Sequence, residues 1–214
     1  MSSPTPARSS ATPSLTERRK AATRMEIARA AAGLFVTRGL RATRAEDIAQ
    51  AAGIAPRTFY RYFATKEEAV APLYAAGAER WAQAVREAPA RLSAPEALAH
   101  AVHHTLTPGR GVSESSWDWV RTLVRVATTS PALGKVWAEV CHDSEHALAE
   151  ALAPRLPDNV AAPRLAFTAA VAAAAIRVAV ETWAAGDAPA VGPEGPAALA
   201  LDNLSLLTDY PWHP

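Results

Sequence analysis

The 214-residue chain is half hydrophobic, and its 22 Lys and Arg against 21 Asp and Glu give a net charge of +1. A chain of this length buries a sizeable core, and its Ala-rich composition favours a helical globular protein. The single cysteine, Cys141, excludes an intramolecular disulfide and suits a reducing compartment.

The chain shows no targeting or membrane signal. No apolar segment follows the first charges, as a secretory signal would require, and the longest apolar run, 165–176, is too short to span a bilayer. We therefore expect a soluble, cytoplasmic protein with no membrane partner.

The charge is divided unequally along the chain. Residues 1–66 hold 12 Lys and Arg against 4 Asp and Glu, a net charge of +8, whereas residues 67–214 hold 10 against 17, a net charge of −7. This asymmetry indicates a polyanion as partner of the basic part. Charge alone leaves open the alternative of a solvated basic surface.

The first elements follow from caps and breakers. Residues 1–14, rich in Ser, Thr, Pro and Ala, are expected to be a disordered arm. A helix is predicted over 16–38, and its basic start is unfavourable for the helix dipole unless a phosphate backbone lies nearby. A capping box at 43–46 predicts a second helix, and Pro56 suits the first position of a third.

A second capping box, at 65–68, predicts the start of a fourth helix, whose first turns Pro72 should kink or disturb. No longer segment has the alternation of a strand, so we expect an all-α chain of about nine helices. From the fourth onward, helices are predicted over 65–87, 95–106, 116–129, 131–153, 161–185 and 197–209.

The third helix separates into two faces. At 100° per residue, Phe59 and Phe63 fall on one inward wedge, which Tyr62 joins. Arg57 and Arg61 face away from this wedge. Two helices joined by a Gly-containing turn, the second short and cationic, indicate a helix-turn-helix whose second helix enters the major groove of DNA.

The outward side chains of this helix suit contacts with bases, and its flanks suit contacts with phosphates. Arginine pairs bidentately with guanine, and threonine contacts bases by hydrogen bonds or through its methyl group. Tyrosine and lysine are placed for the phosphate backbone. The candidate DNA-binding residues are Thr43, Arg44, Arg57, Thr58, Tyr60, Arg61, Tyr62 and Lys66.

These motifs occur together over about residues 24–70: Leu34-Phe35, Arg38-Gly39, Thr43, Asp47-Ile48-Ala49, Ala52-Gly53-Ile54, Thr58-Phe59-Tyr60, Tyr62-Phe63 and Lys66. In residue type and spacing this segment resembles the N-terminal domain of the TetR family of bacterial transcriptional regulators. Two departures are Ala55, where the family often has a capping Ser, and Gly33 inside the first helix.

The resemblance implies a three-helix helix-turn-helix domain over 15–66 and a ligand-binding and dimerisation domain over 67–214. It implies a homodimer in which the helices at 161–185 and 197–209 pair with their copies as a four-helix bundle. The implied function is a repressor released from a palindromic double-stranded DNA operator by a small-molecule effector. The pattern "RTLVRVATTSPAL" also resembles a subgroup from high-GC bacteria, some members of which respond to acyl-coenzyme A.

Aromatic and cationic side chains of the second half are candidate effector contacts, because both types occur in small-molecule pockets. The same Trp side chains also fill cores, and Arg side chains also reach for solvent, so both interpretations stay open. Arg177 and Glu181 are expected to pair with each other or across the dimer. The candidate effector-binding residues are Trp81, Trp117, Arg121, Arg125, Trp137, His142 and Trp183.

Histidines at helical spacing in 100–104 and 142–146 raise the alternative of a metal site. Such spacing is common by chance, so we expect neither a metal nor a cofactor. Cys141 and His142, adjacent on a helix, face different directions, and no catalytic loop motif occurs, so we do not expect an enzyme. The alternative function is a metal- or small-molecule-binding protein whose helix-turn-helix is vestigial.

Overall fold

The computed structural model describes residues 14–110, 116–157 and 159–207, and this part of the chain contains nine α-helices and no strand. The predicted all-α class is confirmed. Of the predicted arm over 1–14, residues 1–13 lie outside the described residues, and Ser14 is the N-cap of α1. The helices are α1 (Leu15–Arg38), α2 (Ala45–Ala51), α3 (Pro56–Tyr62), α4 (Ala71–Glu87), α5 (Ala94–Thr105), α6 (Trp117–Thr129), α7 (Pro131–Leu152), α8 (Ala162–Ala185) and α9 (Pro196–Ser205).

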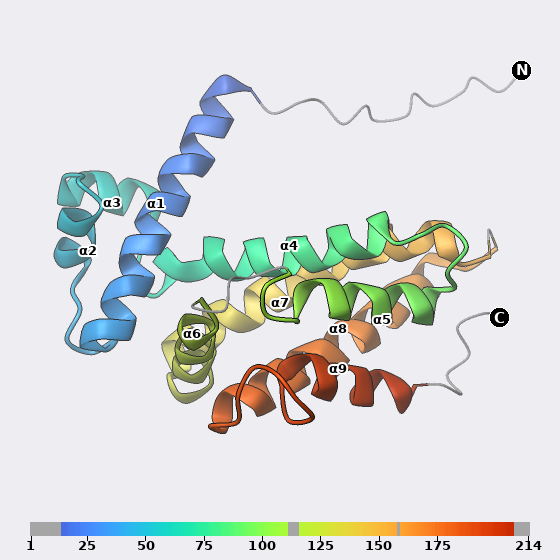
Figure 1. Ribbon diagram of the computed structural model, residues 1–214. Coiled ribbons are helices and arrows are strands. Elements are labelled where there is room, and N and C mark those ends of the chain that lie inside the picture. The colour runs from blue at the N-terminus through green and yellow to red at the C-terminus, as the bar shows by residue number, and fades with distance from the viewer. Residues whose placement is uncertain (1–13, 111–115, 158, 208–214) are drawn as a thin grey trace, which may run out of the picture.

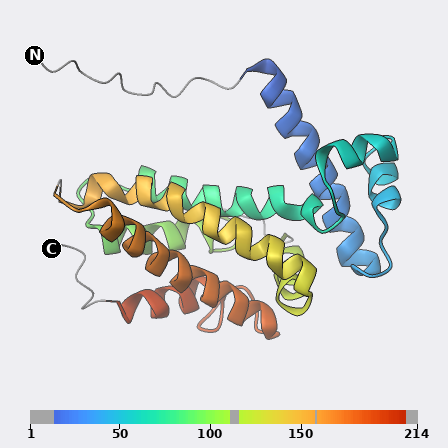
Figure 2. The ribbon, with the colours of Figure 1, turned by 180° about the vertical axis from the view of Figure 1, so that it is seen from behind.

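The helices form two units (Figures 1 and 2). Helices α1, α2 and α3 pack together at one end, and the first turns of α1 project beyond the rest of the molecule. Helices α4 to α9 form a bundle in which α7 lies against α4 and α8, and α9 lies against α8 and α5. Helix α6 packs on α7 and α8 and also reaches α1, so it bridges the two units.

The start of α1 is stabilised by a capping box that the sequence interpretation missed. Ser14 Oγ accepts a hydrogen bond from the Glu17 N–H (3.2 Å), and the Glu17 carboxylate accepts one from the Ser14 N–H (2.7 Å). Hydrogen bonds from the Ser14 backbone N–H and from the Ser14 side chain to this carboxylate hold the pKa of Glu17 below its ordinary value. A negative charge therefore stands at the positive end of the helix dipole, and no external phosphate is needed to explain α1.

The predicted capping box at 43–46 is wrong by one residue. The cap is Arg44, whose N–H donates to the Asp47 carboxylate (2.9 Å), and α2 begins at Ala45. Thr43 turns its hydroxyl back to the Gly39 carbonyl (2.9 Å) and so closes the α1–α2 turn instead.

The chain between α3 and α4 follows the prediction only in part. Thr65 Oγ1 accepts the Glu68 N–H (3.2 Å), as a cap should, but the Glu68 carboxylate accepts the N–H of Ala64 (3.0 Å). A 3₁₀ turn, η1 (Glu68–Val70), follows before α4 begins. The helix predicted from 65 therefore begins only at Ala71, and Pro72 lies in its first turn, where the missing N–H is tolerated without a kink.

The later helix boundaries lie within one residue of the predicted ones, with one exception. Helix α9 ends at Ser205, whereas the predicted end at 209 lies outside the described residues. A 3₁₀ turn, η3 (Ala153–Arg155), continues α7.

One hydrophobic cluster joins the two units. It contains Phe35, Ile48 and Phe59 from α1, α2 and α3, together with Tyr74 from α4 and Leu123 from α6. This cluster crosses the predicted domain boundary at 66/67. Because protein interiors are close-packed, a displacement of α4 or α6 is transmitted to α1–α3.

Candidate functional site

The two faces of α3 have the burial that the helical wheel predicts. Phe59 and Phe63 are buried, with ring centroids 5.8 Å apart, and they fix α3 in the cluster shared with the bundle. Arg57 and Arg61 are exposed, and Thr58 is half-buried. The short helix thus presents its cationic side to solvent, as a major-groove helix must.

The two tyrosines of α3 differ in exposure. Tyr60 is 52% exposed, and its hydroxyl donates to the Glu46 carboxylate (3.3 Å) on α2. Tyr62 is half-buried beneath the Arg61 guanidinium, which lies 5.4 Å from its ring centroid. Arg24 of α1 donates to the Tyr62 carbonyl (3.0 Å), and this contact holds α3 against α1.

The side chains of Thr43 and Lys66 stabilise the α1–α2 turn by donating hydrogen bonds to its carbonyls. Thr43 is 1% exposed, which does not fit the prediction that its side chain contacts DNA. The Lys66 ammonium donates to the carbonyls of Leu40 (2.7 Å) and Thr43 (2.8 Å). Two of its three N–H donors are therefore used inside the protein, and one remains for a phosphate. The sequence did not predict this structural role of Lys66.

Replacing Lys66 with alanine is expected to lower the free energy of unfolding by about 1–3 kcal/mol, because two part-buried carbonyls lose a charged donor. It should also weaken binding to operator and scrambled DNA alike, since the turn beside the recognition helix loosens. Urea denaturation and fluorescence anisotropy measure these effects. An unchanged unfolding midpoint would contradict the structural task given to Lys66.

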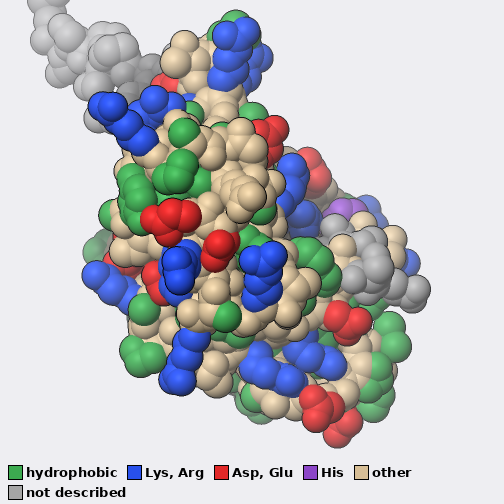
Figure 3. Space-filling model, turned by 90° about the vertical axis from the view of Figure 1, so that its left-hand side faces the viewer, with side chains coloured by type: hydrophobic (Ala, Val, Ile, Leu, Met, Phe, Trp, Pro, Cys, Tyr) green, Lys and Arg blue, Asp and Glu red, His purple; other side chains and the backbone are tan. Residues whose placement is uncertain are grey.

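The end of the molecule formed by α1–α3 carries exposed basic side chains (Figure 3). Arg44 is exposed at the start of α2, at the end of the α1–α2 turn. Acidic side chains lie among the basic ones in this view, so the surface is mixed rather than uniformly positive.

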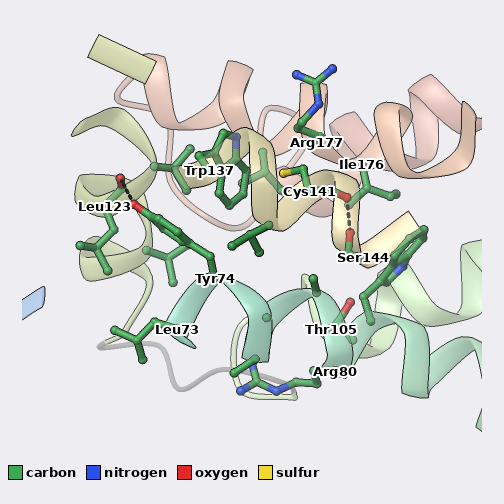
Figure 4. Close-up of a pocket in the computed structure, with 18 of the residues that line it drawn as sticks. Leu73, Tyr74, Arg80, Thr105, Leu123, Trp137, Cys141, Ser144, Ile176 and Arg177 are labelled. Carbon is green, nitrogen blue, oxygen red and sulfur yellow. Dashed lines mark hydrogen bonds between the residues drawn. The ribbon is translucent and has the colours of Figure 1, made fainter. Parts of the chain in front are cut away.

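A partly open cavity of about 900 Å³ lies between the bundle and α1, and side chains from α1, α4, α5, α6, α7 and α8 line it. Figure 4 shows Tyr74, Trp137, Cys141 and Ile176 lying around the same space, from α4, α7 and α8. A cavity of this size within a bundle, walled mainly by apolar and aromatic side chains, is typical of a small-molecule site.

The hydroxyl and thiol groups in this wall are uncharged, and the hydroxyls of Tyr74 and Ser144 donate hydrogen bonds within the protein. The Tyr74 hydroxyl donates to the Leu123 carbonyl (2.9 Å), and burial raises the pKa of Tyr74 far above its ordinary value. Burial also raises the pKa of the Cys141 thiol to about 12, so the thiol stays neutral and unreactive at neutral pH. Ser144 donates its hydroxyl to the Cys141 carbonyl (2.7 Å).

Arg177 and Glu181 pair as predicted, with guanidinium and carboxylate atoms 3.0 Å apart. The same carboxylate accepts the indole N–H of Trp137 (2.6 Å). Arg177 also lines the cavity, so this ion pair forms part of its wall.

Three of the predicted effector contacts, Trp81, Trp117 and Trp137, line the cavity. Arg121, Arg125 and Trp183 do not, because they hold the loop between α8 and α9. Arg121 stacks on the Trp183 ring, 4.4 Å from its centroid, and donates to the Ala188 carbonyl. Arg125 donates to the carbonyls at the end of α8, among them Ala184 (2.8 Å).

His142 is also absent from the cavity. Its side chain is exposed and lies 3.5 Å from the carboxylate of Glu145, which itself lines the cavity. His146 similarly faces Glu150 (3.4 Å), and His100 stacks on His104 on the surface of α5. Among the described residues, no three His, Cys, Asp or Glu side chains are grouped as a metal site would require.

Sequence reasoning missed the part of the wall that α1 supplies. Met25, Arg29 and Ala32 of the DNA-binding unit line the cavity. Beside them, the Trp119 ring of α6 packs on Gly33, 3.4 Å from where a Cβ would stand. A glycine inside a helix costs about 1 kcal/mol relative to alanine. Gly33 was therefore the one signal in the sequence that another side chain packs closely on α1.

Comparison with known proteins bears on both units. Residues 27–71 match the family model described as bacterial regulatory proteins of the tetR family, and residues 92–193 match the model described as the MftR C-terminal domain. The transcriptional regulator TcmR of Streptomyces glaucescens is 30% identical over 177 residues, which are 80% of this chain and 77% of TcmR. The repressor KstR2 of Mycobacterium tuberculosis is 51% identical over 47 residues, 22% of this chain and 24% of KstR2.

Solved structures share the fold over most of the chain. The TetR-family repressor FadR of Thermus thermophilus, in complex with lauroyl-CoA, is 25% identical with a TM-score of 0.54, covering 86% of this chain and 92% of FadR. The repressor AlkX of Dietzia is 19% identical with a TM-score of 0.57, covering 87% of this chain and 94% of AlkX.

An exposed cationic helix behind a tight turn, fixed to a bundle with a large cavity, defines a helix-turn-helix DNA-binding regulator with a ligand domain. The chain belongs to the TetR family of bacterial transcriptional regulators.

Proposed function

We propose that this protein is a cytoplasmic homodimeric repressor that binds a palindromic operator and leaves it when an apolar effector fills the cavity. The observation that carries this proposal is that α1 of the DNA-binding unit supplies part of the cavity wall, through Met25, Arg29 and Ala32. An effector in the cavity contacts the DNA-binding unit directly. Effector binding and DNA binding can therefore be coupled without a chain of intermediate residues.

The DNA-binding step follows from the geometry of α3. Two copies related by a twofold axis present two recognition helices, which meet successive major grooves when they stand about 34–36 Å apart. Arg57 and Arg61 then read bases, while the backbone contacts of Arg44, Tyr60 and Lys66 set the register.

Helix α8 supplies the dimer face in this proposal. By length and composition it is the one helix among the described residues that is apolar enough to cross a membrane, yet only 22% of that stretch is buried. Val178 is 44% exposed, and Val171, seven residues before it, is half-exposed on the same face. Since α9 already covers another side of α8, a second copy of this helix pair would bury the strip and complete a four-helix bundle.

Replacing Val178 with aspartate is expected to raise the dimer dissociation constant at least about tenfold, since the twofold axis brings two unpaired charges into one apolar interface. Light scattering after gel filtration measures the mass at a series of concentrations. Val191→Asp is the matched control, because Val191 is 55% exposed in the loop before α9. Equal dimerisation of both variants would exclude this face of α8.

Effector binding is coupled to DNA binding through α1 and α6. A molecule in the cavity contacts Arg29 on α1 and, through the α6 wall, the Trp119 ring that packs on Gly33. It favours dimers in which α1–α3 have turned relative to the bundle, so the recognition helices no longer match two grooves. Linkage requires that operator DNA lowers effector affinity by the same factor.

The effector contains a sizeable apolar part. The cavity of about 900 Å³ accommodates one, and the structurally similar FadR repressor is complexed with lauroyl-CoA, an acyl thioester. A thermal-shift screen identifies ligands, since a ligand at one hundred times its Kd stabilises by about 2.7 kcal/mol. A ligand that stabilises the protein and leaves operator affinity unchanged would contradict release by this cavity.

A further inference from the structure

We propose that the effector is an apolar molecule bearing hydrogen-bond acceptors, and that the indole N–H groups of Trp81 and Trp117 donate to these acceptors. This inference rests on the proposed function, because it concerns the same cavity. It adds the chemical feature by which the cavity distinguishes its effector from other apolar molecules of similar size.

The indole N–H groups of Trp81 and Trp117 are buried and have no hydrogen-bond partner within the protein. The two side chains are 8% and 4% exposed, and both line the cavity. More than nine in ten buried polar groups are paired in folded proteins, since an unmade hydrogen bond loses the solvation of the donor. Two unpaired donors in one wall therefore indicate groups that a bound molecule satisfies.

Other tryptophans of the bundle show that unpaired donors are not general here. Trp137 lines the same cavity, and its N–H donates to the Glu181 carboxylate (2.6 Å). Trp183, away from the cavity, donates to the carbonyls of Ala188 (3.1 Å) and Pro189 (3.2 Å). The unpaired state is thus confined, among these buried indoles, to two whose side chains line the cavity.

The chemistry of the cavity wall indicates which hydrogen-bonding groups the effector carries. An indole N–H only donates, so its partner is an acceptor such as a carbonyl or ether oxygen. The hydroxyls of Tyr74, Thr105 and Ser144 already donate to backbone carbonyls and do not compete for it. The aromatic rings around these donors favour an apolar body between the acceptors.

A matched pair of probes tests the inference on the full chain. Fluorene and 9-fluorenone share one tricyclic skeleton and differ in a single carbonyl acceptor. Equilibrium dialysis gives the affinity of each probe for the wild type, for the double variant Trp81→Phe/Trp117→Phe, and for Trp137→Phe. The last variant is the matched control, because it removes an indole whose N–H is already paired inside the protein.

The double variant is expected to lower the fluorenone affinity about threefold to tenfold relative to fluorene, the value of one neutral hydrogen bond. In Trp137→Phe the ratio of the two affinities should remain that of the wild type. The single variants Trp81→Phe and Trp117→Phe then divide the effect between the two donors.

Three outcomes overturn the inference, and they are distinguishable. An equal affinity ratio in all proteins means that water satisfies the two donors, and it leaves the proposed function standing. A ratio that falls as much in Trp137→Phe means that ring size alone matters. Failure of the wild type to bind either probe contradicts the cavity as a site for apolar molecules, and with it the proposed function.

Where the double variant does not fold, the wild type gives the same answer. In a protein labelled with ¹⁵N-tryptophan, fluorenone should shift the indole N–H resonances of Trp81 and Trp117 downfield, and fluorene should not. Identical shifts with both probes would overturn the inference.

Discussion

Replacing Arg57 and Arg61 together with alanine is expected to weaken operator binding by about 2–6 kcal/mol, at least about thirtyfold in Kd, if each guanidinium holds one guanine. Both side chains are exposed on α3. Arg57 makes no hydrogen bond or ion pair with other described residues, and Arg61 only covers the Tyr62 ring. Their removal therefore leaves the fold intact, and the loss falls on DNA contacts.

Fluorescence anisotropy on operator and scrambled duplexes at two salt concentrations measures this effect. Arg91→Ala is the control, because Arg91 is an exposed arginine beyond the end of α4, far along the chain from α3. Base reading requires that the operator loses more affinity than the scrambled duplex. Equal losses on both would assign Arg57 and Arg61 to phosphates and contradict the base-reading face.

Replacing Phe59 with alanine is expected to lower the free energy of unfolding by about 3–5 kcal/mol, the range for a buried phenylalanine. Its side chain has no exposure and packs on Phe63 within the cluster that joins α1–α3 to the bundle. Loss of this anchor also frees α3, since a helix of seven residues is not stable alone.

Urea denaturation followed by circular dichroism measures the change, with Tyr60→Ala as the neighbouring control. Tyr60 is exposed, so its replacement should lower the free energy of unfolding by less than about 1 kcal/mol. Similar values for the two variants would mean that Phe59 is not the anchor of the recognition helix.

The recognition helix could be predicted in detail because its information is local. The four-residue spacing of Phe59 and Phe63 sets the buried face, and Arg57 and Arg61 follow on the other side. Helix ends were equally accessible, since Pro and Gly residues mark most of them. The Ser14–Glu17 cap carried the same kind of local signal and could have been found.

The cavity could be predicted only in part, because its wall depends on which helices meet. Trp81 and Trp183 both lie on long helices of the bundle, yet only Trp81 reaches the cavity, since α6 and the loop after α8 enclose Trp183. Arg121 and Arg125 were assigned to a ligand for their charge, whereas distant carbonyls of that loop accept their hydrogen bonds. No local pattern shows that Met25 of α1 faces this space.

Hydroxyl-radical footprinting of the DNA upstream of the gene tests the central claim most directly. The account predicts a protected inverted repeat whose half-site centres lie one helical turn, about 34–36 Å, or a whole multiple apart. Protection should vanish from both halves together in the Arg57→Ala/Arg61→Ala variant. Protection of a single half-site, or no inverted repeat at all, would contradict a dimer that reads DNA with two α3 helices.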